Sequence, residues 1–166
     1  MCTSLVYRDS REKLYFGRTM ELTIDLPYQL AYLPEGVPFR STVEGHPALS
    51  FEGRYAFVAI AMPARAPTPE QPLGLADLKA LEGLNTAGLT FSLLSYPAAG
   101  GGRQAVDRTR AVLSASDLGT WVLSQFDTVP AVRAALGDQP VLLEPLALLG
   151  GVESPFHYVV HDRSGA

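Results

Sequence analysis

Cys2 is the residue of this chain whose type and position point most directly to chemistry. A small side chain in second position normally permits removal of the initiator methionine, which would make Cys2 the first residue. Its thiol, with a reference pKa of about 8.5, and its α-amine, at about 7.7–8.0, would then both titrate close to working pH. The amine could accept the thiol proton and later pass it to a leaving amine. On this dipeptide alone, an ordinary cysteine that happens to be second is the stronger interpretation.

No other pair of a nucleophile and a base is evident in the sequence. None of His46, His157 and His161 has an obvious acidic partner beside a nucleophile. An N-terminal cysteine carries its own base, so no histidine is required. A single cysteine excludes an intramolecular disulfide. A redox-sensing thiol is a further alternative, and it rests on Cys2 alone.

The composition is that of a globular protein and argues against several classes of partner. Hydrophobic residues make up 47% of the 166 residues and charged residues 18%, which argues against disorder. The net charge of −4 and the scattered arginines argue against nucleic acid or an anionic membrane surface. There is no apolar run of about 18 residues, so no membrane span is predicted. No signal peptide follows Met1, so we expect a cytoplasmic protein, with an exported form left open if a leader was removed.

The elements that must position Cys2 are predicted to be strands first and helices later. Alternating or continuous apolar runs bounded by turn residues predict strands over residues 3–7, 13–16, 28–33, 54–62, 88–96 and 156–160. The polar segment between the first two strands suits a hairpin turn. Residues 78–84 are expected to hold a short helix or turn. Strands followed by helices and a last strand favour an α+β fold with an antiparallel sheet.

Two helices are expected between the fifth and sixth predicted strands. Ser116 and Asp117 can cap a helix that continues to Phe126, where apolar residues recur every three to four positions. Thr128 can cap the next helix, which has Pro130 in its first turn and is expected to end at Gly137.

Four segments carry a resemblance to one known family. Residues 2–21 read CTSLVYRDSREKLYFGRTME, in which a nucleophile, a hairpin and Gly-Arg-Thr-Met-Glu follow in order. Further segments are RYAFV at 54–58, EGLNTAGL at 82–89 and PFHYVVHDRSG at 155–165. Together they resemble, over the whole chain, the choloylglycine hydrolase and penicillin V acylase family of N-terminal-nucleophile hydrolases. Each segment alone is weak evidence for the resemblance, but four such segments in the same order are strong evidence.

The resemblance implies roles for residues at the start of the chain. Cys2 matches the family nucleophile, and Arg18 matches an arginine beside the thiol, where a guanidinium favours the thiolate. Glu21 takes the place of an aspartate that helps hold the new α-amine, and Asp25 is a weaker alternative for that role.

Three further residues receive expected roles from the same resemblance. Asn85 matches an asparagine that contributes to the oxyanion hole, although a turn asparagine is the open alternative for its Asn-Thr-Ala-Gly context. Met20 and Leu22 are expected to help line an apolar acyl pocket, with ordinary core packing at least as good an interpretation for Leu22.

The resemblance also implies the fold and the reaction. We expect the four-layer αββα sandwich of N-terminal-nucleophile hydrolases, with residues 1–166 forming the N-terminal part of a single domain whose C-terminal half is absent. The implied reaction is hydrolysis of a linear amide C–N bond in a small N-acyl substrate, of the conjugated bile salt or penicillin V type. No metal or cofactor is implied, and a homo-oligomer is possible. The alternative is an inactive truncated fragment that only binds a partner or self-associates.

Overall fold

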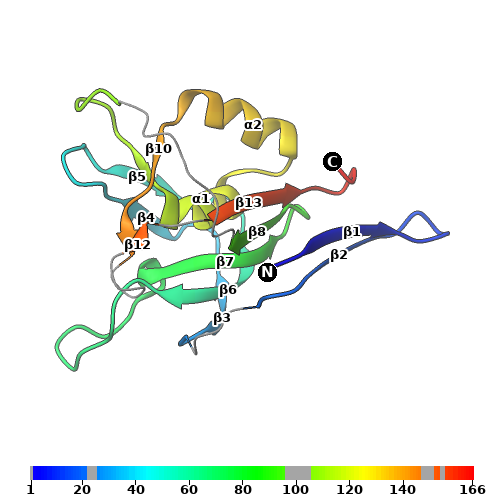
Figure 1. Ribbon diagram of the computed structural model, residues 1–166, viewed down its shortest axis with the longest axis horizontal. Coiled ribbons are helices and arrows are strands. Elements are labelled where there is room, and N and C mark those ends of the chain that lie inside the picture. The colour runs from blue at the N-terminus through cyan, green and yellow to red at the C-terminus, as the bar shows by residue number, and fades with distance from the viewer. Residues whose placement is uncertain (1, 22–25, 96–105, 147–151, 154–155) are drawn as a thin grey trace.

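A five-stranded antiparallel sheet organises the chain in the computed structural model, which describes residues 2–21, 26–95, 106–146, 152–153 and 156–166. The strand order is β13-β8-β7-β6-β3. In chain order these strands are β3 (Gln29–Leu33), β6 (Phe57–Pro63), β7 (Leu78–Asn85), β8 (Thr90–Ser95) and β13 (Phe156–His161). Figure 1 shows the helices on one side of this sheet and the first hairpin running beside it. The expected α+β class with an antiparallel sheet is confirmed.

One face of the sheet is closed by α1 (Leu118–Gln125), which lies across β7 and β8. The approach is very close at two glycines. A Cβ at Gly83 would lie 2.5 Å from Leu123 Cδ1, and a Cβ at Gly119 would lie 2.4 Å from the Ala80 carbonyl oxygen. Glycine is therefore what lets this helix and this sheet pack together. Around this contact lies the core cluster, whose most deeply buried members are Leu33, Phe57, Ala59, Ala61, Leu89, Phe91, Leu113, Val122 and Leu123.

The helix α2 (Val129–Asp138) begins where the sequence predicts, but its first turn is held by a different residue. Thr128 occupies the N-cap position without a capping side-chain hydrogen bond. Instead, Asp162 Oδ2 accepts a hydrogen bond from the Val129 backbone N–H at 2.8 Å. Asp117 likewise precedes α1 without capping it, because its carboxylate binds Ser41 and Lys79. Both caps predicted from neighbouring residues therefore differ from what the structure shows.

The prediction of a short helix or turn over residues 78–84 is wrong. This segment is β7, which pairs with β6 on one side and β8 on the other. Lys79, Ala80 and Leu81 favour helices locally, but pairing with strands on both sides overrides that preference. The other predicted strands are confirmed within a few residues at their ends.

Smaller elements surround the main sheet. The hairpin of β1 (Ser4–Arg8) and β2 (Leu14–Arg18) forms a two-stranded sheet of its own, and β4 (Pro38–Ser41) pairs with β5 (Leu49–Glu52). Two-residue strands form a parallel pair, β9 (Leu113–Ser114) with β10 (Val141–Leu142), and an antiparallel pair, β11 (Pro145–Leu146) with β12 (Val152–Glu153). Single 3-10 turns, η1 (Leu75–Asp77) and η2 (Ala115–Asp117), precede β7 and α1. In the part of the chain that the structure describes, no helix has the length and apolar character to span a bilayer.

Candidate active site

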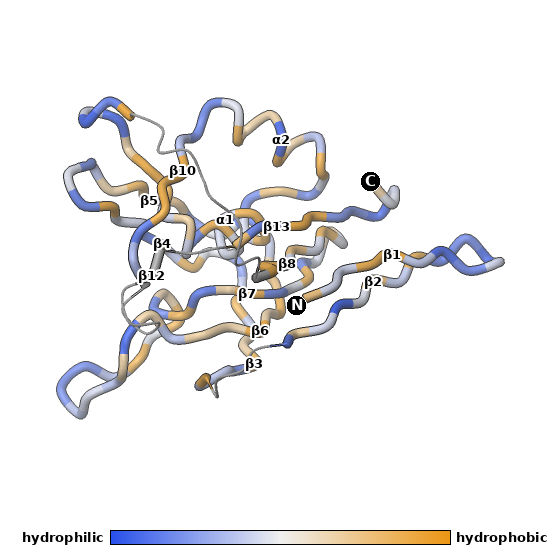
Figure 2. The backbone as a smooth tube through the Cα atoms, in the orientation of Figure 1, coloured by the Kyte–Doolittle hydropathy of each residue, from blue (hydrophilic) through white to orange (hydrophobic). Residues whose placement is uncertain are grey.

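The hairpin β1–β2 positions the first candidate residues. Its polar turn is closed by Asp9, whose Oδ1 accepts hydrogen bonds from the backbone N–H groups of Arg11 and Lys13, both at 2.9 Å. These bonds hold the pKa of the Asp9 carboxyl below its ordinary value, the Lys13 bond being the largest cause. Figure 2 shows this polar tip at the end of a more apolar hairpin. The turn sets the register that places Ser4 opposite Arg18.

Cys2 lies on the same face of the hairpin as Arg18. The Thr19 N–H donates to the Thr3 carbonyl at 2.9 Å, and the Thr3 N–H donates to Thr19 Oγ1 at 3.1 Å. The two segments of the hairpin therefore stay paired beyond the ends of β1 and β2. Side chains alternate between faces in extended backbone. Cys2 is two residues before Ser4, and Ser4 is the cross-strand partner of Arg18. The structure therefore brings Cys2 and Arg18 to one side of one hairpin.

Arg18 is buried between this hairpin and the main sheet. Its side chain is only 3% exposed, and its Nε lies 3.4 Å from Glu82 Oε2 on β7. The same Nε donates to the Thr19 carbonyl at 3.1 Å. Two residues earlier, the ring of Phe16 lies 5.7 Å from that of His161 on β13. The hairpin thus packs across the sheet face opposite α1, with its charged end over β7.

Glu82 is a member of this site that the sequence interpretation missed. Burial raises the pKa of the Glu82 carboxyl above its ordinary value, and the neighbouring Arg18 guanidinium opposes that rise. The signal for it was present: in a β-strand over residues 78–85, Glu82 is a carboxylate placed within an apolar segment. Reading that segment as a helix or turn hid which face the carboxylate would occupy.

Glu21 lies exposed just beyond β2. Hydrogen bonds from the amino terminus of the chain and from the Thr19 side chain, in that order of importance, hold the pKa of Glu21 below its ordinary value. The role expected of Glu21 toward the α-amine of Cys2 stays a prediction. Met20 beside it is half-buried. Leu22 and Asp25, the other residues named from the sequence at this point, lie outside the described residues.

The structure does not bring Asn85 to the hairpin face. Asn85 is 4% exposed, and its Nδ2 donates to the carbonyls of Leu123 and Phe126 at 2.9 and 2.7 Å. Its Oδ1 accepts from the Leu89 N–H at 2.9 Å. Both amide hydrogens are therefore used at the end of α1, on the opposite side of the sheet from Arg18. The structure gives Asn85 the turn role that was the open alternative to an oxyanion-hole donor.

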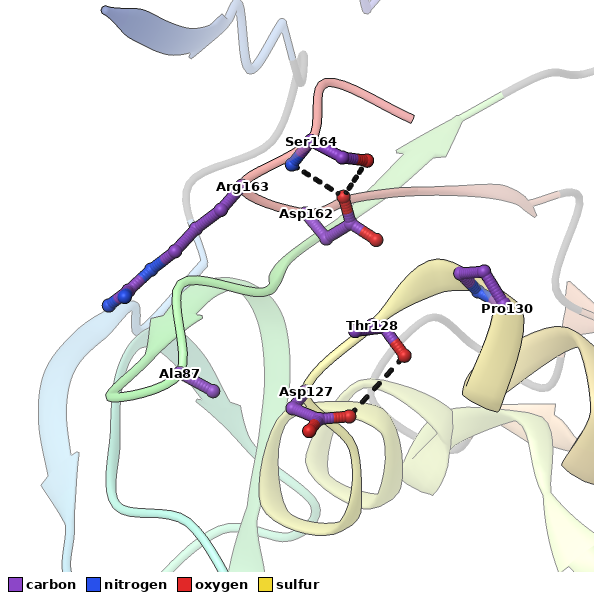
Figure 3. A pocket seen from close by; sticks show the side chains of 7 residues that line it. All are labelled: Ala87, Asp127, Thr128, Pro130, Asp162, Arg163 and Ser164. Atoms are coloured by element: carbon purple, nitrogen blue, oxygen red, sulfur yellow. Dashed lines mark hydrogen bonds between the residues drawn. The ribbon is translucent and has the colours of Figure 1, made fainter.

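A shallow depression lies elsewhere, where the chain's last turn meets the start of α2 (Figure 3). Asp162 is its central group and accepts hydrogen bonds from the Ser164 N–H and the Val129 N–H, both at 2.8 Å. Hydrogen bonding from the Ser164 side chain, followed by the Val129 N–H, lowers the pKa of Asp162. These contacts close a turn and cap a helix, so we assign the depression a structural role. Among the described residues, no group of three or more His, Cys, Asp or Glu side chains is arranged to hold a metal ion.

Solved structures match this fold over nearly the whole chain. A conjugated bile acid hydrolase from Clostridium perfringens matches in its C2A mutant with a TM-score of 0.75 and 18% identity, over 99% of this chain and 46% of that one. Its R18L variant matches with a TM-score of 0.74 and 16% identity, with the same coverage of both chains. Penicillin V acylase from Agrobacterium tumefaciens matches with a TM-score of 0.73 and 20% identity, over 99% of this chain and 44% of that one. The chain thus spans less than half the length of these structures.

The comparison with known families includes the hairpin and the whole of the main sheet. No curated protein matches the chain. Residues 2–166 match the family described as linear amide C-N hydrolases, choloylglycine hydrolase family. The chain therefore belongs to the choloylglycine hydrolase family of linear amide C–N hydrolases.

Proposed function

We propose that this chain carries the nucleophilic half of an amidase that hydrolyses N-acyl amides through Cys2. The observation that carries the proposal is the shared hairpin face of Cys2 and the buried Arg18 guanidinium. A cation beside a thiol favours the thiolate, which is the attacking species. Membership in a linear amide hydrolase family supplies the kind of bond to be cleaved.

The proposed reaction has two steps. After removal of Met1, the Cys2 thiolate attacks the amide carbonyl, and the thiol proton passes to the α-amine. A C–S bond forms, the C–N bond breaks, and the α-amine returns the proton to the leaving amine. Water then attacks the thioester, which releases the carboxylic acid and restores the thiol. The chemistry requires no metal or cofactor.

Glu21 would orient the α-amine in this scheme. A glutamate at this position reaches one methylene farther than the family aspartate. Because both amide hydrogens of Asn85 bond carbonyls at the end of α1, the donor to the oxyanion would have to come from another group.

The substrate class follows from the family and from the names of the matching structures. One of them is a conjugated bile acid hydrolase and another a penicillin V acylase, so we propose a small N-acyl amide with an apolar acyl group. Met20, half-buried beside the hairpin end, would contribute to the acyl wall, and Leu22 is proposed for the same wall. A cytoplasmic location stays a prediction.

A second β-layer would complete the four-layer αββα sandwich. The sheet face opposite α1 leaves Leu30, Tyr32, Val58 and Leu84 exposed by 79%, 62%, 45% and 52%, respectively. These four apolar side chains lie on neighbouring strands, and an exposed apolar patch of this kind indicates a surface that another layer covers. The same patch favours the second candidate function, in which the chain self-associates or binds a partner without catalysing a reaction.

Mass spectrometry of the intact chain tests the proposal. The chain is purified, the loss of Met1 is read from its mass, and it is incubated with penicillin V or with a conjugated bile salt. The proposal expects an acyl adduct on Cys2 that hydroxylamine removes, as a thioester requires. Cys2→Ala is the matched control, and an adduct of equal yield on that variant would contradict the assignment. A stable self-associated chain that forms no adduct with either compound would favour the second candidate.

A further inference from the structure

The layer between the hairpin and the sheet is polar at the end where Cys2 lies. Glu82 sits on β7 opposite Ile60 of β6 and Ser92 of β8, so its backbone is held from both sides. Its neighbour Gly83 faces α1, and Glu82 therefore faces the hairpin. A carboxylate in a doubly paired strand has a fixed position from which to orient a partner.

Arg18 requires such a partner because it is almost completely buried. A buried guanidinium cannot lose its charge, so an acceptor or a counter-charge must offset its lost hydration. Among the described residues, Glu82 is the carboxylate within 4 Å of it, at 3.4 Å from Nε. The Glu82 side chain is itself 22% exposed, so the pair is poorly hydrated on both sides.

The two ends of the guanidinium differ in what they contact. Nε is engaged by Glu82 and by the Thr19 carbonyl. Nη1 is buried and has no hydrogen-bond partner in the described part of the chain. A guanidinium is planar, so holding Nε also sets the direction in which the Nη donors point. Two buried hydroxyls share this layer without partners among the described residues: Ser4 Oγ, cross-strand from Arg18, and Ser92 Oγ, cross-strand from Glu82.

We propose that Glu82 is the positioning residue of Arg18, holding Nε so that Nη1 remains directed at the anion that forms beside it on the hairpin face. That anion is the Cys2 thiolate before attack. The inference rests on the proposed function, because it assigns Glu82 to the same site. Glu82 acts through Arg18 and does not itself touch the reacting atoms.

Electrostatics alone makes the opposite prediction, which gives the proposal a clear test. Removing a negative charge near Arg18 would strengthen the positive field at Cys2 and make its thiol more reactive. Removing a positioning group would let the guanidinium turn away and make the thiol less reactive. The sign of the change in thiol reactivity therefore separates the two accounts.

The experiment measures the rate of Cys2 alkylation by iodoacetamide at pH 7 in the 166-residue chain. Cys2 is the only cysteine, so the whole signal belongs to it. We expect Glu82→Ala to slow alkylation about 10-fold, which corresponds to a thiol pKa higher by about one unit. Glu82→Gln keeps an acceptor for Nε and should recover much of the rate. Glu35→Ala, which removes an exposed carboxylate in a turn, should leave the rate unchanged.

A double variant shows whether Glu82 acts through Arg18. Arg18→Ala should slow alkylation, and adding Glu82→Ala to it should produce little further change. Faster alkylation in Glu82→Ala, or a full additional loss in the double variant, would overturn the inference about Glu82 alone. An unchanged rate in Arg18→Ala would overturn the proposed function together with this inference. Circular dichroism confirms that each variant is folded, and Glu82→Leu, which also lacks an acceptor for Nε, replaces Glu82→Ala if the latter does not fold.

Discussion

The two faces of the central sheet are built on opposite principles. The face toward α1 is apolar and tightly packed, with Phe91 fully buried and two glycines that leave no room for a methyl group. The face toward the hairpin holds the Arg18–Glu82 pair, unpartnered buried hydroxyls among the described residues, and exposed apolar side chains.

This difference indicates that the α1 face supplies stability and that the hairpin face carries the proposed site. The α1 face gives the fold its cohesion, because close packing of apolar side chains is what folded proteins depend on. The hairpin face holds buried charges that have lost hydration energy, and reactive sites commonly hold such charges. We therefore expect substitutions on the two faces to have effects of different kind as well as of different size.

The largest effect should come from removing a core side chain on the α1 face. Phe91 is fully buried and its ring lies 5.7 Å from that of Tyr158. Phe91→Ala should lower the free energy of unfolding by about 3–5 kcal/mol, because a large cavity replaces the ring. Urea denaturation followed by circular dichroism measures this. A loss below about 1 kcal/mol would mean that this face does not hold the fold together.

Adding one methyl group at the closest approach should be the next largest effect. Gly119→Ala places a Cβ 2.4 Å from the Ala80 carbonyl oxygen and 2.7 Å from the Phe91 ring, and should cost about 1–3 kcal/mol through overpacking. Gly137→Ala on α2 is the matched control, because its Cβ would meet nothing within 4 Å. That control should stabilise the chain by about 0.5–1 kcal/mol. Equal shifts of the denaturation midpoint in the same direction would contradict this packing.

Removal of the side chain that caps α2 should have a moderate effect that depends on pH. Asp162→Ala should cost about 0.5–2 kcal/mol at pH 7, as loss of a helix cap does. The folded pKa of Asp162 lies below its unfolded value of about 3.9, so the stabilisation is complete above that value. It is lost as pH falls through the lowered folded pKa. Thermal unfolding of both proteins across this range should show the difference shrinking in acid, and a difference that grew in acid would be inconsistent with the cap.

The smallest change in stability should come from the exposed patch on the hairpin face. Leu30→Ser combined with Tyr32→Ser should change the free energy of unfolding by less than about 0.5 kcal/mol, because both side chains are largely exposed. The same double variant should reduce self-association in sedimentation velocity, since it removes apolar surface. Unchanged self-association together with a large loss of stability would reverse the distinction between the faces.

Local patterns predicted much of the fold. Alternating or continuous apolar runs indicated β1, β2, β3, β6, β8 and β13, and helical spacing indicated α1 and α2. The pattern failed at β7, where residues with helical preference form a strand because strands pair with them on both sides. It also missed the Asp162 cap, because the carboxylate and the Val129 N–H are separated by 33 positions in the chain.

The residues of the candidate site at the start of the chain were named from a family resemblance, and their roles stay predictions. Cys2, Arg18 and Glu21 lie within one hairpin and its continuation, so their proximity follows from a local turn. Glu82 is distant in sequence: the apolar segment around it is a signal for a buried carboxylate, but only the sheet, which places β7 beneath that hairpin, identifies Arg18 as its partner. Asn85 illustrates the converse, because which side of the strand it faces decides its contacts, and that side is set by the register.

The most direct test of the central claim is the titration of the Cys2 thiol itself, followed by the ultraviolet absorbance of the thiolate. With a single cysteine the signal has one source. If the buried Arg18 acts on Cys2, the midpoint should lie about one unit or more below the reference value of about 8.5. It should return toward that value in Arg18→Ala. A midpoint at the reference value that Arg18→Ala does not move would contradict the account.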